Sequence, residues 1–187
     1  MKYVLYAPLQ IVCMIVCYLT NWIVVLFADE EGELPGFLRL WQTWDDTLDN
    51  KQDIARMPKF LQYDWDKHYL QFTVDERGQT RYMEKLVKPF TMREKLKRYL
   101  CRCHWLYRNC GYGFAFYWFG VDVKPPVRAT IYPDWYYLST DNAWAYKSNT
   151  EAFYGLHWKI YVGWKIQRQL NHPHRAMIAT RVWISHK

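Results

Sequence analysis

The chain has 187 residues, of which 51% are hydrophobic and 19% aromatic, and a formal net charge of +7. This length is enough to bury a hydrophobic core and predicts one domain with an appendage. The odd number of cysteines, five, argues against a scaffold held together by disulfides. Residues 1–53 hold three basic and eight acidic side chains, whereas residues 54–187 hold twenty-two and ten. Such a basic body favours anionic partners, either phospholipid or nucleic acid.

Residues 3–28 carry no formally charged side chain. As a helix rising about 1.5 Å per residue, this segment would exceed the roughly 30 Å hydrocarbon core of a bilayer. A cleaved signal peptide is disfavoured because Leu26 stands where a small residue should precede the cut after Ala28. A buried core helix is rarely so long. We therefore predict that residues 1–28 form an uncleaved, transmembrane-like anchor helix and that the protein is membrane-associated.

Residues 29–59 are predicted to form an acidic collar and an amphipathic segment. Pro35 suits the first turn of a helix in "LPGFLRLWQTW". Trp41 and Trp44 would then lie at headgroup depth as interfacial anchors. The sequence leaves open the alternative that this segment packs on the body of the protein. The acids that open the collar are Asp29, Glu30, Glu31 and Glu33.

Residues 60–187 are predicted to form an aromatic-rich, basic α+β body. "HYLQFTVDERGQTRYMEKLV" predicts a β-hairpin with Gly78 in its turn. Apolar residues alternate from Tyr154 to Ile166, as a half-buried antiparallel strand requires, and "AMIATRVWIS" predicts a last strand. "GYGFAFYWFGV" predicts a buried strand or an interface-dipping segment, because it is too short to span a bilayer as a helix. The fold class is therefore α+β: an N-terminal hydrophobic helix, then a mainly antiparallel β-sheet body with one basic amphipathic helix.

That basic helix is predicted in "PFTMREKLKRYLCRCHWLYRNCG", where Thr91 and Glu94 form a capping box and Gly111 follows the end. Its apolar face would comprise Leu96, Leu100, Cys103 and Tyr107. The basic side chains on its other faces are candidates for contacts with anionic lipid or nucleic acid, and an anchored chain favours lipid. An ordinary solvated helix face is the alternative. The candidates are Arg93, Lys95, Lys97, Arg98, Arg102 and Arg108.

Motifs for catalysis or metal binding are weak. The chain has no phosphate-binding glycine loop, no G-x-S-x-G elbow and no H-E-x-x-H. His172 and His174 flank Pro173 in a turn without a nearby carboxylate. In "CRCHWLYRNC" the C-x-C spacing departs from the usual zinc pair, and no second pair follows the potential ligands Cys101, Cys103, His104 and Cys110. We predict that the protein is not an enzyme and has no catalytic residue, metal or cofactor.

Three stretches spread over most of the chain carry a resemblance: "FADEEGELPGFLRLWQTWDDTLD", "WLYRNCGYGFAF" and "HWKIYVGWKI". The matching motifs are Trp41-Gln42-Thr43 with Asp45, Leu48 and Asp49, then Trp105 to Asn109, Tyr112 to Phe114, and Gly163 to Lys165. With these motifs the chain resembles an uncharacterised family of small membrane-associated proteins of tailed bacteriophages. The resemblance implies a phage origin and no established activity. The cysteines of "CRCHWLYRNC" are not part of that pattern.

The sequence and the resemblance together predict a non-enzymatic phage membrane-associated protein. The favoured version is a virion component that engages the host membrane during genome delivery. One alternative is an early-expressed inner-membrane factor for superinfection exclusion or host takeover, and a second is a membrane-tethered nucleic-acid-binding protein or enzyme. The expected partners are the membrane through residues 3–28, anionic headgroups, other phage or host proteins and, less favoured, nucleic acid. The expected location is the host inner membrane or the phage virion.

Overall fold

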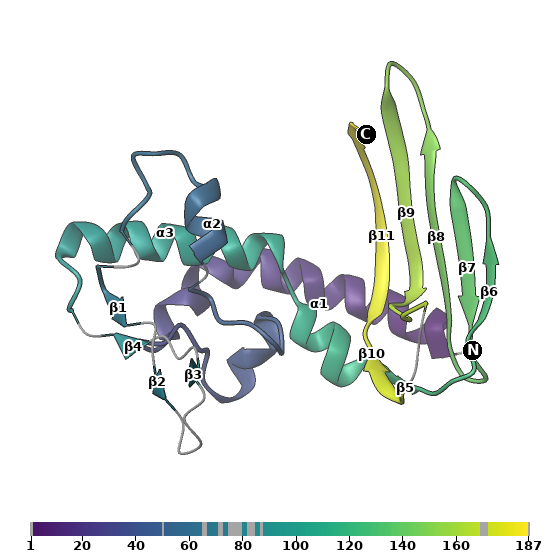
Figure 1. Cartoon of the computed structure of the whole chain (residues 1–187), viewed down its shortest axis with the longest axis horizontal. Helices are drawn as coiled ribbons and strands as arrows, with labels where there is room; N and C mark the ends of the chain where they lie inside the picture. The colour runs from purple at the N-terminus through teal and green to yellow at the C-terminus, as the bar shows by residue number, and fades with distance from the viewer. Residues whose placement is uncertain are drawn as a thin grey trace. The chain divides into compact units, whose positions relative to one another are not determined.

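A computed structural model describes residues 2–49, 51–64, 67–70, 73–74, 80–81, 85–86, 88–168 and 172–186 (Figure 1). Contacts divide the chain into two units: Met1–Val16 with Tyr112–Lys187, and Cys17–Gly111. We call them the sheet unit and the collar unit. This division differs from the boundaries after residues 28 and 59 expected from composition, because the first helix contributes to both units. The α+β fold class with an N-terminal apolar helix is confirmed.

The N-terminal helix α1 spans Lys2–Val24 and continues as a 3-10 turn, η1, over Val25–Phe27. Among the described residues it is the one helix that is long and apolar enough to cross a membrane. Pro8 lies inside α1 near its start. The helix stops where charged residues begin, since Ala28 already has extended backbone angles.

The collar unit combines short elements with one long helix. A 3-10 helix, η2 (Gly36–Trp41), and a short helix, α2 (Lys51–Arg56), precede α3 (Met92–Arg108). Between α2 and α3, β1 (Tyr69–Leu70) pairs antiparallel with β4 (Lys85–Leu86), and β2 (Thr73–Val74) pairs with β3 (Thr80–Arg81). This nested pairing agrees with the predicted hairpin, whose turn at Gly78 lies outside the described residues.

Helix α3 begins as its sequence predicts. The Thr91 side chain accepts a hydrogen bond from the backbone N–H of Glu94, and the Glu94 carboxylate accepts one from the backbone N–H of Thr91. The predicted apolar face is wrong at its two ends, since Leu96 is 60% and Tyr107 is 41% exposed, whereas Cys103 is buried as expected. The helix instead turns inward a face that includes two arginines. Its buried residues are Arg98, Cys101, Arg102, Cys103, Trp105 and Leu106.

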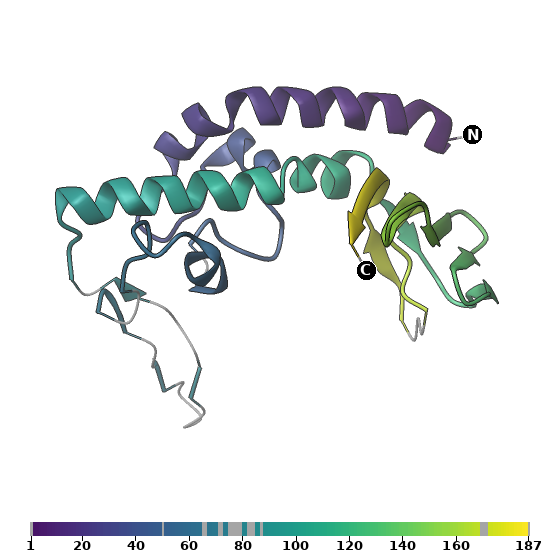
Figure 2. The ribbon, with the colours of Figure 1, turned by 90° about the horizontal axis from the view of Figure 1, so that it is seen from above.

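The part of α1 within the collar unit packs beside α3, which runs back alongside it in both views (Figures 1 and 2). Tyr18 stacks on Tyr107 with ring centroids 5.9 Å apart. The hydroxyl of Tyr99 donates to the backbone carbonyl of Trp22 at 2.7 Å. This bond satisfies a polar group near the end of α1, where helical carbonyls lose their regular partners. A separate core cluster packs α2 and its following loop against Cys101 of α3 and Phe90.

The sheet unit contains a five-stranded antiparallel sheet in the order β11-β9-β8-β7-β6 (Figure 1). Its strands are β6 (Arg128–Ile131), β7 (Trp135–Ser139), β8 (Trp144–Glu151), β9 (Leu156–Trp164) and β11 (Ile178–His186). A separate antiparallel pair joins β5 (Val121–Val123) to β10 (His174–Ala176). The strands predicted at 154–166 and 176–185 are therefore confirmed as β9 and β11. Residues 114–118, expected to be extended or interfacial, form a π-helical turn, η3 (Phe114–Trp118), which buries Phe114 and Ala115.

The register gives the sheet two unlike faces, because directly opposite residues share a side. One face, the apolar face, carries Trp158, Ile160 and Val162 of β9 with Val182 and Ile184 of β11, and Trp135, Tyr137 and Tyr146 of β7 and β8. The other, the cationic face, carries Tyr136, Lys147, Lys159, Tyr161 and Arg181. The alternation predicted for β9 is present, but burial does not follow it, since the apolar Trp158 is exposed whereas the neighbouring Lys159 is half-buried.

One end of the apolar face is covered by the start of α1. The ring of Tyr3 lies 4.9 Å from that of Trp144 and 5.4 Å from that of Trp164. Its hydroxyl donates to the carbonyl of Ala179 at 3.0 Å. The first residues of α1 therefore belong to the sheet's core, and the predicted anchor is also an integral part of the folded body.

Candidate functional site

Helix α1 buries its less apolar stripe. In the sheet unit the buried positions of α1 include Ala7 and Gln10, and in the collar unit they include Cys17, Asn21 and Val24. Positions spaced alternately three and four residues apart lie on one helix face. The buried stripe thus carries the small residues and two amides of a helix that is otherwise strongly apolar.

The two amides are incompletely satisfied. Nε2 of Gln10 lies 2.7 Å from Sδ of Met14, and Nδ2 of Asn21 lies 3.8 Å from Sγ of Cys110. Oε1 of Gln10 and Oδ1 of Asn21 have no hydrogen-bond partner among the described residues. A buried unsatisfied polar atom costs about 1–3 kcal/mol. The inward placement of these two amides therefore costs free energy.

The exposed face of α1 is its more apolar side. Leu19 is 69%, Leu26 66% and Leu5 64% exposed. A helix of a water-soluble protein turns its apolar stripe to the core and its polar side to solvent, whereas α1 does the reverse. We call this surface the outer face of α1. Its large side chains are Val4, Leu5, Leu9, Ile11, Val12, Ile15, Val16, Tyr18, Leu19, Trp22, Ile23, Leu26 and Phe27.

The collar that follows α1 is a tightly hydrogen-bonded loop. The carboxylate of Asp29 accepts from the backbone N–H of Glu33 at 2.7 Å, and the backbone N–H of Leu48 donates to the carbonyl of Gly32 at 2.9 Å. Gly32 adopts φ +80°, and a Cβ there would lie 2.8 Å from Oδ2 of Asp49. A glycine is required because the backbone is left-handed and in close contact at the same position.

The Trp-Gln-Thr-x-Asp-x-x-Leu-Asp motif holds this loop in place. Trp41 donates from Nε1 to Oγ1 of Thr20 at 2.9 Å. Oε1 of Gln42 accepts from the backbone N–H of Leu34 at 2.9 Å, and Gln42 is fully buried. Leu48 is 2% exposed. Trp41, Gln42 and Leu48 are therefore structural supports of the collar.

The last motif residue, Asp49, pairs with two arginines of α3. Nε of Arg102 donates to Oδ1 of Asp49 at 2.9 Å, and Nε of Arg98 donates to Oδ2 at 3.1 Å. Both guanidinium groups also donate to backbone carbonyls, Arg102 to Asp29 at 2.8 Å and Arg98 to Glu30. Burial alone would raise the pKa of Asp49, but the bonds and charges of Arg102 and Arg98 outweigh it and hold that pKa below its ordinary value.

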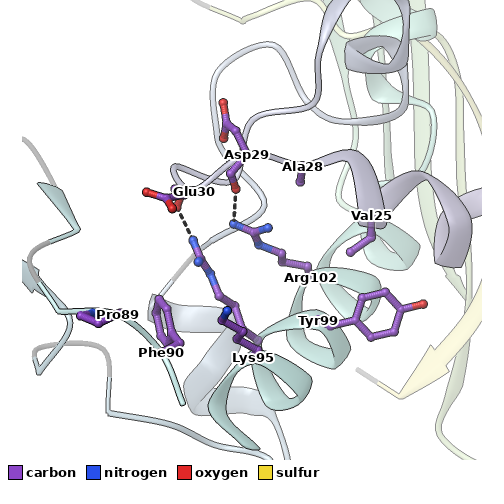
Figure 3. Close-up of a pocket in the computed structure, with 10 residues that line it drawn as sticks. Val25, Ala28, Asp29, Glu30, Pro89, Phe90, Lys95, Tyr99 and Arg102 are labelled. Carbon is purple, nitrogen blue, oxygen red and sulfur yellow. Dashed lines mark hydrogen bonds between the residues drawn. The ribbon is translucent and has the colours of Figure 1, made fainter. Parts of the chain in front are cut away.

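A cavity of about 380 Å³ lies beside this ion cluster, between the end of α1 and α3 (Figure 3). In Figure 3, Arg102 reaches from α3 toward the carbonyl of Asp29, and Tyr99 and Lys95 lie on the same helix. The lining includes three basic residues and the acidic residues Asp29 and Glu30, so the cavity has no strong excess of one charge. Its lining is Val25, Ala28, Asp29, Glu30, Pro89, Phe90, Lys95, Arg98, Tyr99 and Arg102.

A second buried contact lies at the start of α3. His68 stacks on Phe90 with centroids 4.0 Å apart, and its Nε2 lies 3.3 Å from Oε1 of Glu94. Hydrogen bonds from Thr91, with a smaller contribution from His68, lower the pKa of Glu94 to about 2. Glu94 also lies 3.8 Å from the ammonium group of Lys67. The contact has the geometry of a helix cap, and the sequence alone did not reveal that His68 joins it.

The six basic residues of α3 that the sequence predicts to contact lipid or nucleic acid have different environments in the structure. Arg93, Lys95 and Arg108 are exposed, whereas Lys97 donates to the carbonyl of Gln62 at 2.8 Å. Arg98 and Arg102, only 8% and 7% exposed, are wrongly assigned to lipid or nucleic-acid contact, because both are held by Asp49. Their spacing of four residues and the acid-ended motif are the sequence signals from which this cluster could have been inferred.

The two tryptophans predicted to lie at the membrane interface have different environments in the structure. Trp41 is 7% exposed and is bonded to Thr20, so its assignment as a headgroup anchor is wrong and the packing alternative holds for it. Trp44 is half-buried, and its role stays a prediction.

Within the described ranges, no cluster of three or more His, Cys, Asp or Glu side chains could hold a metal ion. All five cysteines lie in the described part, and none forms a disulfide.

Comparison with known families identifies one match. The model of a family of unknown function, DUF7338, matches residues 1–186. Neither the comparison with curated proteins nor the comparison with solved structures finds a match.

Proposed function

The chain belongs to the DUF7338 family, which has no assigned function, and we propose from its geometry that it is a non-enzymatic membrane-associated protein. In this proposal the outer face of α1 lies in lipid. One observation supports it above all: α1 buries Gln10 and Asn21 while it exposes Leu5, Leu19 and Leu26. In membranes, small and polar residues form the helix contacts, and apolar residues face the lipid.

The packing of α1 favours insertion along the membrane surface. In the collar unit α1 lies beside α3, whose exposed residues include Arg108, next to the Tyr107 that stacks on Tyr18 within α1. If this helix pair crossed the bilayer, that charge would enter the hydrocarbon, at a cost of about 2.5–3.5 kcal/mol near its centre. Lying in the interface, α1 can bury its outer face while α3 remains hydrated. The proposed location is thus a membrane surface with one helix embedded.

The biological setting follows from the sequence resemblance alone. We propose a phage protein, with a virion component that engages the host membrane during genome delivery as the favoured role. The alternative is an early-expressed inner-membrane factor that acts on the host. Mass spectrometry of purified particles separates the two, because only the virion component would be found in them.

Flotation of the full chain with vesicles of neutral phosphatidylcholine tests the membrane role. At high salt, where electrostatic attraction is screened, we expect the native chain to float with the vesicles. Leu19→Glu, alone or with Leu26→Glu, should reduce the fraction of protein bound to vesicles. The affinity should fall about tenfold for each 1.4 kcal/mol of binding free energy that the substitution removes. The matched control is Phe60→Glu, which places the same charge at a 72% exposed aromatic residue of the same unit. Equal flotation of the α1 variants and the control, or a native chain that stays in solution, would contradict the proposal.

A further inference from the structure

A row of aromatic and basic side chains crosses the five-stranded sheet on its cationic face. Backbone pairing places Tyr136 opposite Lys147, Lys147 opposite Tyr161, and Tyr161 opposite Arg181. These residues come from four different strands, β7, β8, β9 and β11. Because paired residues point to the same side of a sheet, strand pairing holds the four side chains in one row, in which Lys147 is exposed and the other three are half-buried.

Several cations on or beside this face lie against aromatic rings. Nζ of Lys147 lies 5.8 Å from the ring centroid of Tyr136 and 6.0 Å from that of Tyr161. Cζ of Arg168 lies 4.9 Å from the same Tyr136 ring. Burial, with a smaller effect of Tyr136, raises the pKa of Tyr161, so its hydroxyl stays neutral. Ring contacts restrain these long side chains before any partner binds, which lowers the entropy lost on binding.

The row continues to a third aromatic ring, that of Tyr112, near the edge of the sheet. Nζ of Lys165 lies 4.7 Å and Cζ of Arg181 4.6 Å from the ring centroid of Tyr112. The neighbouring row on the same face adds Lys159 opposite Trp183, which is 40% exposed. Among the described strand residues of this face, Glu151 is the one acid. The face therefore combines a clear excess of positive charge with exposed aromatic surface.

We propose that the cationic face of the sheet binds single-stranded nucleic acid. Restrained cations can contact successive phosphates, and rings such as that of Trp183 can stack on bases that are not paired in a duplex. Surfaces that bind single strands combine these two features, and antiparallel sheets serve as such platforms. The site is separate from the membrane surface proposed above and does not depend on it.

An anionic bilayer fits this face less well. The opposite face of the same sheet is apolar and includes the exposed side chains of Trp158, Val182 and Ile184. Arg128 is its one charged side chain among those described. A bilayer that received the sheet would take the apolar face, because lipid contact there removes hydrocarbon from water. The cationic face would then be directed to water, where it is accessible to a polyanion.

The test measures the fluorescence anisotropy of a labelled oligothymidylate of about 20 nucleotides, a length that exceeds common site sizes. The full chain is kept in a mild neutral detergent, so that the measurement does not require binding to a bilayer. Lys147→Glu should weaken binding at least about fivefold and reduce the magnitude of the salt slope by about 0.7 for each phosphate that the protein no longer neutralises. Arg128→Glu is the matched control: it makes the same charge change at an exposed residue of the same sheet but on the opposite face. Trp183→Leu should weaken binding several-fold with the salt slope unchanged.

Three outcomes would overturn the proposal: no binding by the native chain at physiological salt, equal losses for Lys147→Glu and Arg128→Glu, or equal affinity for a duplex of the same length. Lys147→Gln replaces Lys147→Glu if circular dichroism shows that the latter is unfolded. Binding to phosphatidylglycerol vesicles that requires Lys147, without binding to the oligonucleotide, would assign the face to lipid instead. Flotation on neutral vesicles depends on α1, so either proposal can fail while the other stands.

Discussion

Oδ1 of Asp49 accepts a hydrogen bond from Nε of Arg102 at 2.9 Å, deep in the collar unit. The same carboxylate is bonded to Arg98, one turn earlier on α3. Both arginines also bond to carbonyls of the residues that follow α1. One acid of the collar motif therefore joins the loop after α1 to α3, and it removes two arginines from the surface.

Replacement of Asp49 should be strongly destabilising. Asp49→Asn leaves Arg98 and Arg102 buried without their counter-charge, and breaking a buried ion pair typically costs about 3–5 kcal/mol. Urea unfolding of the full chain in a mild detergent, followed by circular dichroism, measures the loss. Asp45→Asn is the control, because Asp45 is exposed on the same loop and should change stability by less than about 0.5 kcal/mol. Similar stabilities of the two variants would contradict a structural role of the cluster.

Acid should weaken the start of α3 through Glu94. Its folded pKa of about 2 lies below the ordinary value of 4.5, so its contribution to stability is full above about pH 4.5 and is lost as the pH falls toward 2. Glu94→Gln retains a side chain that can complete the capping box but does not titrate. The difference in unfolding free energy between native chain and variant should shrink between pH 4.5 and 2. Curves that stay parallel through this interval would show that the cap does not depend on the charge.

A methyl group at Gly32 should be less tolerated than one at Gly36. Both glycines have positive φ, +80° and +48°, but a Cβ at Gly32 would meet Asp49 whereas one at Gly36 meets nothing within 4 Å. Gly32→Ala should therefore lower the unfolding free energy more than Gly36→Ala, by about 1–3 kcal/mol, the range for overpacking. Equal effects would mean that backbone strain alone decides both positions.

The bond between Trp41 and Thr20 should be measurable as a coupling. Trp41→Phe removes the Nε1 donor, and Thr20→Val removes the hydroxyl acceptor of the 2.9 Å bond. A double-mutant cycle on unfolding free energy should give a coupling of about 0.5–1.5 kcal/mol, the net value of a typical hydrogen bond. Additive single effects would show that the two side chains only pack side by side.

Local signals predicted the secondary structure of α3, β9 and β11 well, because capping residues and hydrophobic alternation act over a few neighbouring positions. They predicted burial poorly. The apolar residues of α3 suggested that Leu96 faces the core, yet the helix turns Arg98 and Arg102 inward, because Asp49, about fifty residues earlier, neutralises part of their charge. The four-residue spacing of the two arginines places them on one face of α3, but no local pattern indicates that an acid so distant in the chain lies against that face.

By itself, the sequence determined an apolar N-terminal helix, an α+β class and a basic helix with a capped start, since these depend on composition and short spacing. Only the tertiary structure decided which side of each element is exposed. It showed that α1 buries its amides and exposes its leucines, and that Trp41 packs on Thr20. It also aligned Tyr136, Lys147, Tyr161 and Arg181 in one row, because register between strands brings together residues that lie far apart in the chain.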